Sequence, residues 1–519
     1  MKVDKLSLGE TDCFSPEFIA YLNNPAFATF YKAPAQIASF EQQIKDKTFT
    51  AQQRKTLVEA LQTQYQALST SAYVQHNIQS LLQNKTYTIT TGHQLNIFTG
   101  PLYFIYKIAT AINAAKRLKE AYPAYHFVPV YWMASEDHDY EEIKYIYLHG
   151  QKITWETQQT GAVGRFSPEG LGDLARTIEN CPAVFKEAFE QHTNLADATR
   201  HIVNALFGTE GLVVIDADHA QLKKEFSRII ADDIVNHKAE KLVQETTAQL
   251  EAIGGKGQIM ARPINFFYLN QGLRERLVRD GNTYSALNTD LRWTQEELLK
   301  ELENHPERFS PNVVMRPLLQ EYILPNLAYI GGPAEVVYWL QLKGVFDYYQ
   351  VPFPLLMPRN FALVIPNALV HKMQKAQLSL RDLFLSEQVL KDRIISEEAA
   401  HDYALSKEKQ EFSHFFEQMS RKAEQVDKSL KAMVLAEGAR MAKSLDYLEK
   451  KMKKAEESKH ENRLLQIATL KNQLFPKGGL QERHTNFLEF YIGNPDFIQN
   501  ILQAFDPFDY RFHVISGND

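Results

Sequence analysis

Apolar and polar positions alternate in blocks along the chain, and the most regular block lies between residues 87 and 133. An apolar run ends at Thr91, and residues 127–133 form a second run that is typical of a buried strand. Between the runs, apolar residues recur at helical spacing over about 101–120, at Leu102, Ile105, Ile108, Ala109 and Ile112. Pro suits a first helical turn, so Pro101 is the expected start. This order predicts a βαβ unit with a parallel sheet.

A second unit of this kind predicts an α/β fold with a doubly wound parallel-sheet core and helical insertions. The apolar run 211–215 ends at Asp216, and a helix is expected to start near Gln221. The core is expected to resume at 312–317 and 351–357, after two less regular stretches. The predicted organisation is an N-terminal helical segment (1–85), core (86–149), first insertion (150–205), core (206–239), second insertion (240–310), core (311–366), helical arm (367–475) and C-terminal cap (476–519).

The arm is predicted from its composition and its repeat. Residues 367–475 contain no Pro and a single Gly, Gly438. Apolar residues alternate steps of four and three, as in a coiled-coil seam, at Met441, Leu445, Leu448, Met452 and Ala455. Such a seam needs a partner surface, which is either the arm of a second subunit in a homodimer or a helix of the same chain.

Charge and cysteine content exclude some classes of protein. The net charge of −6 argues against a general nucleic-acid binder, and no apolar run is long enough for a membrane span. The first residues lack the apolar core of a signal peptide, and two Cys give no disulfide framework. We therefore expect a cytoplasmic protein without nucleic-acid or membrane partners.

The loop in "TGHQLNIFTGPLYFIYK", residues 91–107, is a candidate anion site. Ligands bind beyond the carboxyl ends of the strands in open α/β sheets, and a helix start offers free N–H donors. Gly92 and Gly100 allow close approach of the backbone, Thr99 can cap the helix or donate to an anion, and Lys107 lies two turns into it. The loop lacks both the G-K-[ST] ending of a Walker loop and G-x-G-x-x-G spacing. The alternative is an ordinary βα loop capped by Thr99.

An acidic segment follows the second predicted strand. It includes Glu136, Asp137, His138 and Asp139. A carboxylate beside an imidazole can orient and charge it, which favours a general base. A metal site is a second interpretation, and a helix N-terminus with acidic residues is a third.

A third group combines a cation, glycines and aromatic residues. Arg316 is a fork-shaped anion clamp or a partner of Glu321, and Gly331-Gly332-Pro333 opens a predicted helix. Tyr338 and Trp339 either stack on a ligand or belong to the core.

Four motifs together resemble the bacillithiol biosynthesis cysteine-adding enzymes, or cysteine ligases. They are the loop motif already quoted, "VPVYWMASEDHDYEEI", "MRPLLQEYILPNLAYIGGPAEVVYW" and "LFPKGGLQER", in an order that covers essentially the whole chain. The resemblance implies a Rossmann-like core similar to class I nucleotidyltransferases and synthetases, two connecting insertions and a C-terminal coiled-coil arm. It also implies amide formation between L-cysteine and glucosaminyl-malate, the last step of bacillithiol synthesis.

The resemblance also assigns site residues. It implies catalytic roles for Glu136, Asp137, His138 and Asp139. It implies substrate or nucleotide binding by His93, Gln94, Thr99, Gly100, Pro101, Tyr103, Lys107, Arg316, Gln320, Glu321, Gly331, Gly332 and Glu335. Three further binding candidates come from the residue patterns: Gly92 in the loop, Trp339 as a stacking residue and Arg359 as a cation for substrate anions. Because a carboxylate is a poor acyl donor, activation is expected, most simply by ATP. The rival hypotheses are a nucleotide-dependent transferase or ligase that activates another carboxylate, and a non-enzymatic coiled-coil scaffold.

Overall fold

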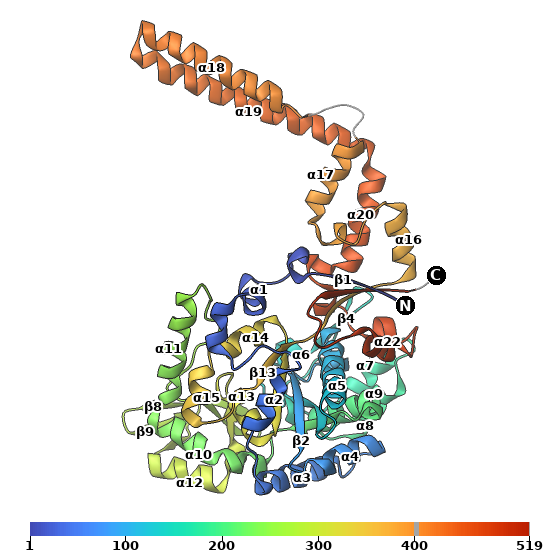
Figure 1. Cartoon of the computed structure of the whole chain (residues 1–519), viewed down its shortest axis with the longest axis vertical. Coiled ribbons are helices and arrows are strands. Elements are labelled where there is room, and N and C mark those ends of the chain that lie inside the picture. Colours follow the sequence, from blue (N-terminus) through green and yellow to red (C-terminus); the bar gives the residue numbers. More distant parts are fainter. Residues whose placement is uncertain (399–403, 518–519) are drawn as a thin grey trace. The chain divides into compact units, whose positions relative to one another are not determined.

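The computed structural model describes residues 1–398 and 404–517 (Figure 1). The chain forms two compact units. The first contains residues 1–365 together with the chain from Gly479 onward, and the second spans Pro366–Gly478. This division lies close to the predicted limits of the arm.

The first unit is built on a five-stranded sheet in which every strand pair is parallel. Its order is β13 (Leu355–Pro358), β12 (Asn326–Gly331), β2 (Thr86–His93), β3 (His126–Met133) and β6 (Val213–Asp216). The chain passes from β2 through β3 to β6 in one direction and later adds β12 and β13 on the other side of β2. The strand order therefore reverses between β2 and β12, which confirms the doubly wound fold. Ligands of such sheets bind outside the carboxyl ends of the strands at this reversal.

Helix α5 (Tyr103–Ala121) connects β2 to β3 and is buried along most of its length. Its Leu118 packs with Ile89, Phe127 and Met357 from three strands, so one apolar cluster joins both halves of the sheet. In the segment 312–317, where the core is expected to resume, helix α13 (Met315–Ile323) begins, and strand β12 follows it. Helix α14 (Pro333–Leu340) begins directly after β12, as the glycines and Pro333 predict.

The chain termini form a small sheet that the sequence did not predict. Strand β1 (Lys2–Leu6) lies antiparallel to β15 (Phe512–Ser516), which lies parallel to β14 (Phe361–Ile365). The N-terminal region is otherwise helical, with α1 (Pro16–Asn23), α2 (Ser39–Asp46), α3 (Ala51–Tyr65) and α4 (Ala72–Ser80).

Two insertions interrupt the core. The first contains α6 (Tyr140–Ile143), the hairpin β4 (Tyr145–Leu148) and β5 (Gln151–Thr154), then α7 (Leu171–Thr177), α8 (Ala183–Gln191) and α9 (Leu195–Phe207). Helices α10 (Ala220–Asn236) and α11 (Lys238–Ala252) lead to the second. Rather than helical, the second is mainly an antiparallel sheet in the order β10 (Arg292–Trp293), β9 (Thr283–Ala286), β8 (Leu273–Asp280), β7 (Phe266–Asn270) and β11 (Phe309–Pro311), with α12 (Gln295–Asn304). Helix α15 (Lys343–Tyr349) precedes β13.

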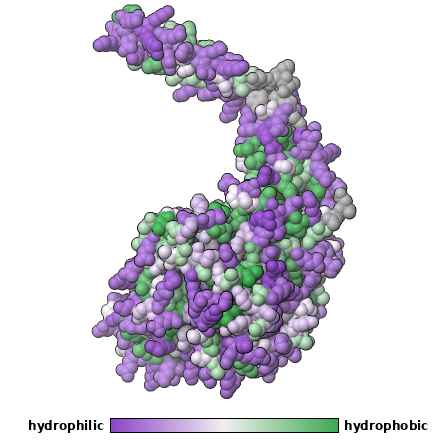
Figure 2. Space-filling model, in the orientation of Figure 1, coloured by the Kyte–Doolittle hydropathy of each residue, from purple (hydrophilic) through white to green (hydrophobic). Residues whose placement is uncertain are grey.

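The second unit is helical. It contains α16 (Asn367–Lys375), α17 (Glu387–Glu398), α18 (Ser406–Val426), α19 (Lys428–Lys459) and α20 (Glu461–Leu474). Helices α18 and α19 form an antiparallel hairpin whose surface is mainly hydrophilic, with scattered apolar side chains (Figure 2). The exposed apolar residues include Met441, Leu448 and Met452 of the predicted seam. None of the helices among the described residues combines the length and the apolar character needed to cross a bilayer.

Candidate active site

Two adjoining cavities lie at the carboxyl ends of the central strands. The first lobe, of about 280 Å³, lies between the end of β2 at His93 and the start of α14 at Gly332. The second lobe, of about 380 Å³, lies between the loop after β3 and strands β8 and β11. Trp132, Ala134 and Arg316 line both lobes and form their shared wall. The cavities therefore occupy the position that the reversal of strand order predicts.

A buried ion pair lies in the wall of the first lobe. Lys107 Nζ lies 2.5 Å from Glu335 Oε2 and donates to the carbonyl of Gly92 at 2.7 Å. Glu335 also accepts hydrogen bonds from the Tyr329 hydroxyl (2.7 Å) and from the Gly332 N–H (2.8 Å). Burial opposes ionisation of Glu335, but Lys107 and the other donors outweigh it and lower its pKa to about 2. Lys107 and Glu335, which were both predicted to bind substrate, thus neutralise each other. Glu335 also accepts the Gly332 N–H at the start of α14, a donor that was expected to bind a ligand.

His93 lines the first lobe as a neutral imidazole. Burial and the nearby Lys107 ammonium lower the pKa of His93 to about 3. Its ring lies 5.1 Å from that of Tyr103, which lines the same lobe. Its buried Nε2 has no hydrogen-bond partner in the part of the chain that the structure describes. A neutral ring of this kind can contact a ligand but adds no charge to the lobe.

Arg316 reaches the shared wall from α13. Its guanidinium lies 5.6–6.0 Å from the ring centres of Trp132, Tyr329 and Trp339. These rings hold the cation by cation–π attraction without neutralising it. Trp339 stacks on Tyr329 at 4.4 Å and is fully buried, so this predicted ligand contact belongs to the core beneath the site.

Gln320 and Glu321 also lie beneath the site. Gln320 accepts a hydrogen bond from Arg316 at 3.1 Å. Glu321 pairs with Lys47 at 3.6 Å and accepts a hydrogen bond from Asn326 at 2.7 Å. The alternative in which Glu321 is the carboxylate partner of Arg316 is therefore wrong. These two residues support Arg316 and line neither lobe.

Arg359 and Arg483 add two cations to the first lobe. Arg359 Nη2 pairs with the buried Glu482 at 2.5 Å, so its charge is balanced within the protein. Arg483 is exposed and has no carboxylate partner among the described residues. Sequence reasoning missed Arg483 as a site residue, although the motif "LFPKGGLQER" contains it. Among the described residues, Arg316 and Arg483 are therefore the cations of this lobe that form no ion pair with a carboxylate.

The loop before α5 is closed to ligands by the C-terminal segment. Leu102 donates its N–H to the carbonyl of Thr485 at 2.8 Å, and Asn486 Nδ2 donates to the carbonyl of Gly100 at 2.6 Å. Thr99 is buried, and Thr99, Gly100 and Pro101 line neither lobe. The helix starts at Tyr103, so the structure does not bring Thr99, Gly100 and Pro101, which were predicted to bind an anion, into either lobe.

Two of the four predicted acidic-segment residues line the second lobe, Glu136 and Asp137. Glu136 forms a buried ion pair with Lys223, which also lies 3.2 Å from Asp218. Burial raises the pKa of Glu136, and the Lys223 ammonium opposes this effect. Asp137 accepts hydrogen bonds from Gln94 Nε2 (2.8 Å) and from the N–H of His138 (2.7 Å).

His138 and Asp139 are exposed and line neither lobe. His138 Nδ1 lies 2.6 Å from Arg274 Nη1. Because a guanidinium group has donors and no acceptor, Arg274 donates this hydrogen bond and His138 Nδ1 accepts it. Burial and the Arg274 charge lower the pKa of His138. Asp137 and Asp139 favour the charged imidazole, but burial and Arg274 outweigh them. Among the described residues, no cluster of three or more His, Cys, Asp or Glu side chains is placed to hold a metal ion.

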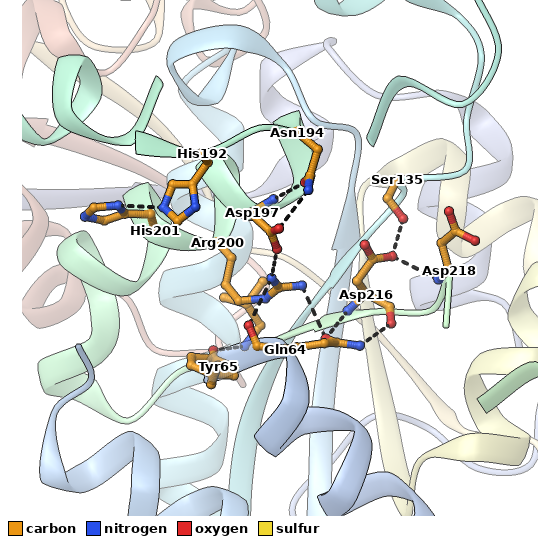
Figure 3. Close-up of polar contacts among 11 residues, drawn as sticks. Gln64, Tyr65, Ser135, His192, Asn194, Asp197, Arg200, His201, Asp216 and Asp218 are labelled. Atoms are coloured by element: carbon orange, nitrogen blue, oxygen red, sulfur yellow. Dashed lines mark hydrogen bonds and ion pairs between the residues drawn. The ribbon is translucent and has the colours of Figure 1, made fainter. Parts of the chain in front are cut away.

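A polar network fixes the start of the acidic segment (Figure 3). Ser135 Oγ donates to Asp216, whose carboxylate also accepts the Asp218 N–H at 2.9 Å. Gln64 bonds both the N–H and the carbonyl of Asp216, at 2.9 and 2.7 Å, and Arg200 holds Gln64 in turn. Burial and the Asp218 charge raise the pKa of Asp216. These contacts tie the ends of β3 and β6 to α3 and α9, and they position the two carboxylates that follow Ser135.

Comparison with known proteins places the chain in a family. Residues 1–360 match the domain described as "Bacillithiol biosynthesis BshC, N-terminal Rossmann-like domain", and residues 362–516 match "Bacillithiol biosynthesis BshC, C-terminal coiled-coil domain". The chain belongs to the BshC family. Its relatives include proteins of Flavobacterium psychrophilum (41% identical), Christiangramia forsetii (40%) and Natranaerobius thermophilus (28%), each named "Putative cysteine ligase BshC". The alignments cover 99% of both chains for the first two and 92% of this chain and 93% of the relative for the third. The resemblance, the Rossmann-like core and the coiled-coil region predicted from the sequence are confirmed.

Proposed function

We propose that this BshC protein is a cysteine ligase that forms an amide bond between L-cysteine and glucosaminyl-malate. The observation that supports it is the charge of the two lobes. Arg316 and Arg483 line the first lobe, Glu136 and Asp137 line the second together with Arg274, and the lobes meet at Trp132 and Arg316. Such a site suits two small substrates whose charged ends point apart and whose reacting groups meet at the shared wall.

The first lobe is the expected site of the malate group. Malate carries two carboxylates, and Arg483 is a cation of this lobe whose charge no protein carboxylate balances among the described residues. Guanidinium groups bind carboxylates through two parallel hydrogen bonds. Because Lys107 and Arg359 are already paired, Arg483 carries more of the substrate charge than the sequence alone predicts.

The chemistry requires an activated carboxyl group and a neutral amine. With ATP as the expected activating substrate, the cysteine carboxyl becomes an acyl phosphate or adenylate. The glucosamine nitrogen then attacks the acyl carbon, a C–N bond forms, and the C–O bond to the phosphate or AMP breaks. The amine loses one proton in this step, and Asp137 is the carboxylate of the second lobe available either to accept this proton or to pair with a substrate ammonium group, since Glu136 is paired with Lys223. Arg316 at the shared wall is placed to stabilise negative charge on the acyl oxygen.

A deletion strain of the source organism tests this function. It should lack bacillithiol and accumulate glucosaminyl-malate, and a copy of the wild-type gene should restore the thiol. Normal bacillithiol in the deletion strain would contradict the proposal.

Arg483→Ala tests the first lobe in the purified protein. Loss of a charged hydrogen bond costs about 1.5–3 kcal/mol, so we expect the affinity for glucosaminyl-malate to fall by about 10- to 100-fold. The matched control is Arg117→Ala on the half-exposed surface of α5, outside both lobes, which should leave the affinity unchanged. Equal affinities of the Arg483 variant and the wild type would remove Arg483 from the site.

A further inference from the structure

We infer that the second lobe is an α-amino-acid subsite, in which Asp137 and Glu136 bind the ammonium group and Arg316 faces the carboxyl group. This inference rests on the proposed function, because it specifies where and how the amino acid of the ligase reaction binds.

The lobe is lined by side chains of both signs of charge. Its carboxylates are Glu136 and Asp137, and its guanidinium groups are Arg274 and Arg316. A purely anionic ligand would meet the two carboxylates, and a purely cationic ligand would meet the two guanidinium groups. A zwitterion matches both, and an α-amino acid carries its two charges one carbon apart.

Asp137 is the carboxylate of this lobe that forms no ion pair with a Lys or Arg among the described residues. It accepts hydrogen bonds from the Gln94 amide and from the N–H groups of His138 and Asp139, all of which are neutral. Glu136, in contrast, shares its charge with Lys223. Three neutral donors fix the Asp137 carboxylate without neutralising it, so an ammonium group can form a charge-assisted hydrogen bond there.

Arg316 is the guanidinium that remains for the carboxyl group. Arg274 lies 3.9 Å over the ring of Phe267 and donates to His138, to Ser310 Oγ (3.2 Å) and to the carbonyl of Pro311 (3.2 Å). These contacts make Arg274 a positioning residue that joins the acidic segment to strands β8 and β11. Arg316 is hydrogen-bonded to the neutral side chains of Gln320 and Tyr338 and lies in the wall through which the carboxyl group must meet the amine of the other substrate.

The rest of the lining favours a small apolar side chain. Met133, Phe267, Pro311 and Val313 line the lobe beside the charged residues. A cysteine side chain behaves as a small hydrophobic group with a weak S–H donor, whereas a charged side chain would lose its hydration against these residues. The volume of about 380 Å³ is near the lower end of the roughly 300–1,000 Å³ of small-molecule sites, which suits one amino acid with its activating group.

Calorimetric binding to the purified full-length protein tests the inference, with and without saturating L-malate and a non-hydrolysable ATP analogue. The ligands are L-cysteine, L-alanine, cysteamine (no carboxylate) and 3-mercaptopropionate (no ammonium). We expect L-cysteine to bind and 3-mercaptopropionate to bind at least about tenfold more weakly. Asp137→Asn keeps an acceptor oxygen and should weaken L-cysteine by a similar factor without changing 3-mercaptopropionate. The control Glu141→Gln alters a 75% exposed acid in the same segment and should change neither affinity.

A second variant separates loss of the subsite from loss of folding. Val313 is 42% exposed, so Val313→Trp fills the lobe from its rim without entering the core. It should abolish L-cysteine binding and leave the thermal unfolding midpoint and glucosaminyl-malate affinity unchanged. L-Alanine binding that depends on Asp137, in the absence of L-cysteine binding, would uphold the subsite and contradict the proposed cysteine ligase. Unchanged L-cysteine affinity in both variants, equal binding of 3-mercaptopropionate, or no amino-acid binding under either condition would overturn the subsite itself.

Discussion

The buried pair of Lys107 and Glu335 allows a quantitative test of what holds the first lobe in shape. The Lys107 side chain is 4% exposed and that of Glu335 is 26% exposed. Removing one partner of a buried pair typically costs about 3–5 kcal/mol, because the remaining charge stays buried. Since the lobe gives solvent some access to Glu335, we expect Lys107→Met to lower the free energy of unfolding by about 3 kcal/mol, at the lower end of that range.

The pKa of Glu335 supports the same size of effect. Its value of about 2 lies roughly 2 units below that of a free glutamate, and one unit corresponds to about 1.4 kcal/mol. A lowered carboxyl pKa stabilises the folded state above the unfolded-state pKa of about 4.3, and this stabilisation is lost as the pH falls from there toward 2. The stability difference between wild type and Glu335→Gln should therefore be large at pH 7 and shrink progressively below about pH 4.

Urea unfolding followed by tryptophan fluorescence measures this effect in the relevant unit. All four tryptophans lie in the first unit, at Trp132, Trp155, Trp293 and Trp339, so the signal omits the helical arm. The control is Lys116→Met on the same helix, whose partner is Glu210 and whose side chain is 52% exposed; it should cost less than about 1 kcal/mol. In a double-mutant cycle, Lys107→Met with Glu335→Gln should cost about 2 kcal/mol less than the sum of the single changes. A Lys107→Met cost equal to that of the control, or additive effects in the cycle, would refute the reasoning.

Three further predictions concern other parts of the molecule. A Cβ at Gly164 would lie 2.5 Å from Ser135 Cβ, so Gly164→Ala should displace the acidic segment and lower ligase turnover by about 10- to 100-fold, with wild-type turnover contradicting a positioning role. Burial raises the pKa of Asp233 to about 7, so ionisation of this carboxyl destabilises the folded state as the pH rises from about 4 to 7. Asp233→Asn cannot ionise, so the thermal midpoint of the variant minus that of the wild type should rise between pH 5 and pH 8, and a constant difference would disprove this. If the exposed seam of α19 pairs two subunits, the wild type should sediment as a dimer at micromolar concentration and Met441→Glu with Leu448→Glu as a monomer, whereas a monomeric wild type would rule out this pairing.

The sequence predicted those parts of the fold that depend on local pattern. Strands β2 and β3 are buried on both faces, so their apolar runs were visible, and α5 carried its helical period. Strand β12 was not identified because it lies between two helices within one continuous motif. The site was predicted in outline, since strand ends and glycines mark it. Its charge balance was not predictable, because Lys107 and Glu335 neutralise each other only after the strands that carry them become neighbours.

Arg483 lines the first lobe but lies near the C-terminal end of the chain, which determines when this lobe forms during synthesis. The first lobe needs Gly92, near the start of the core, and Arg483, which the ribosome adds only after the whole helical arm. At about 5–20 residues per second, the intervening chain takes roughly 20–80 s to translate. Throughout that interval the nascent core lacks the contacts of Thr485 and Asn486 with the loop before α5, as well as the Arg483 cation. Translation that stops within the arm therefore yields a chain without a complete first lobe, so this lobe is complete only after the C-terminal segment has left the ribosome.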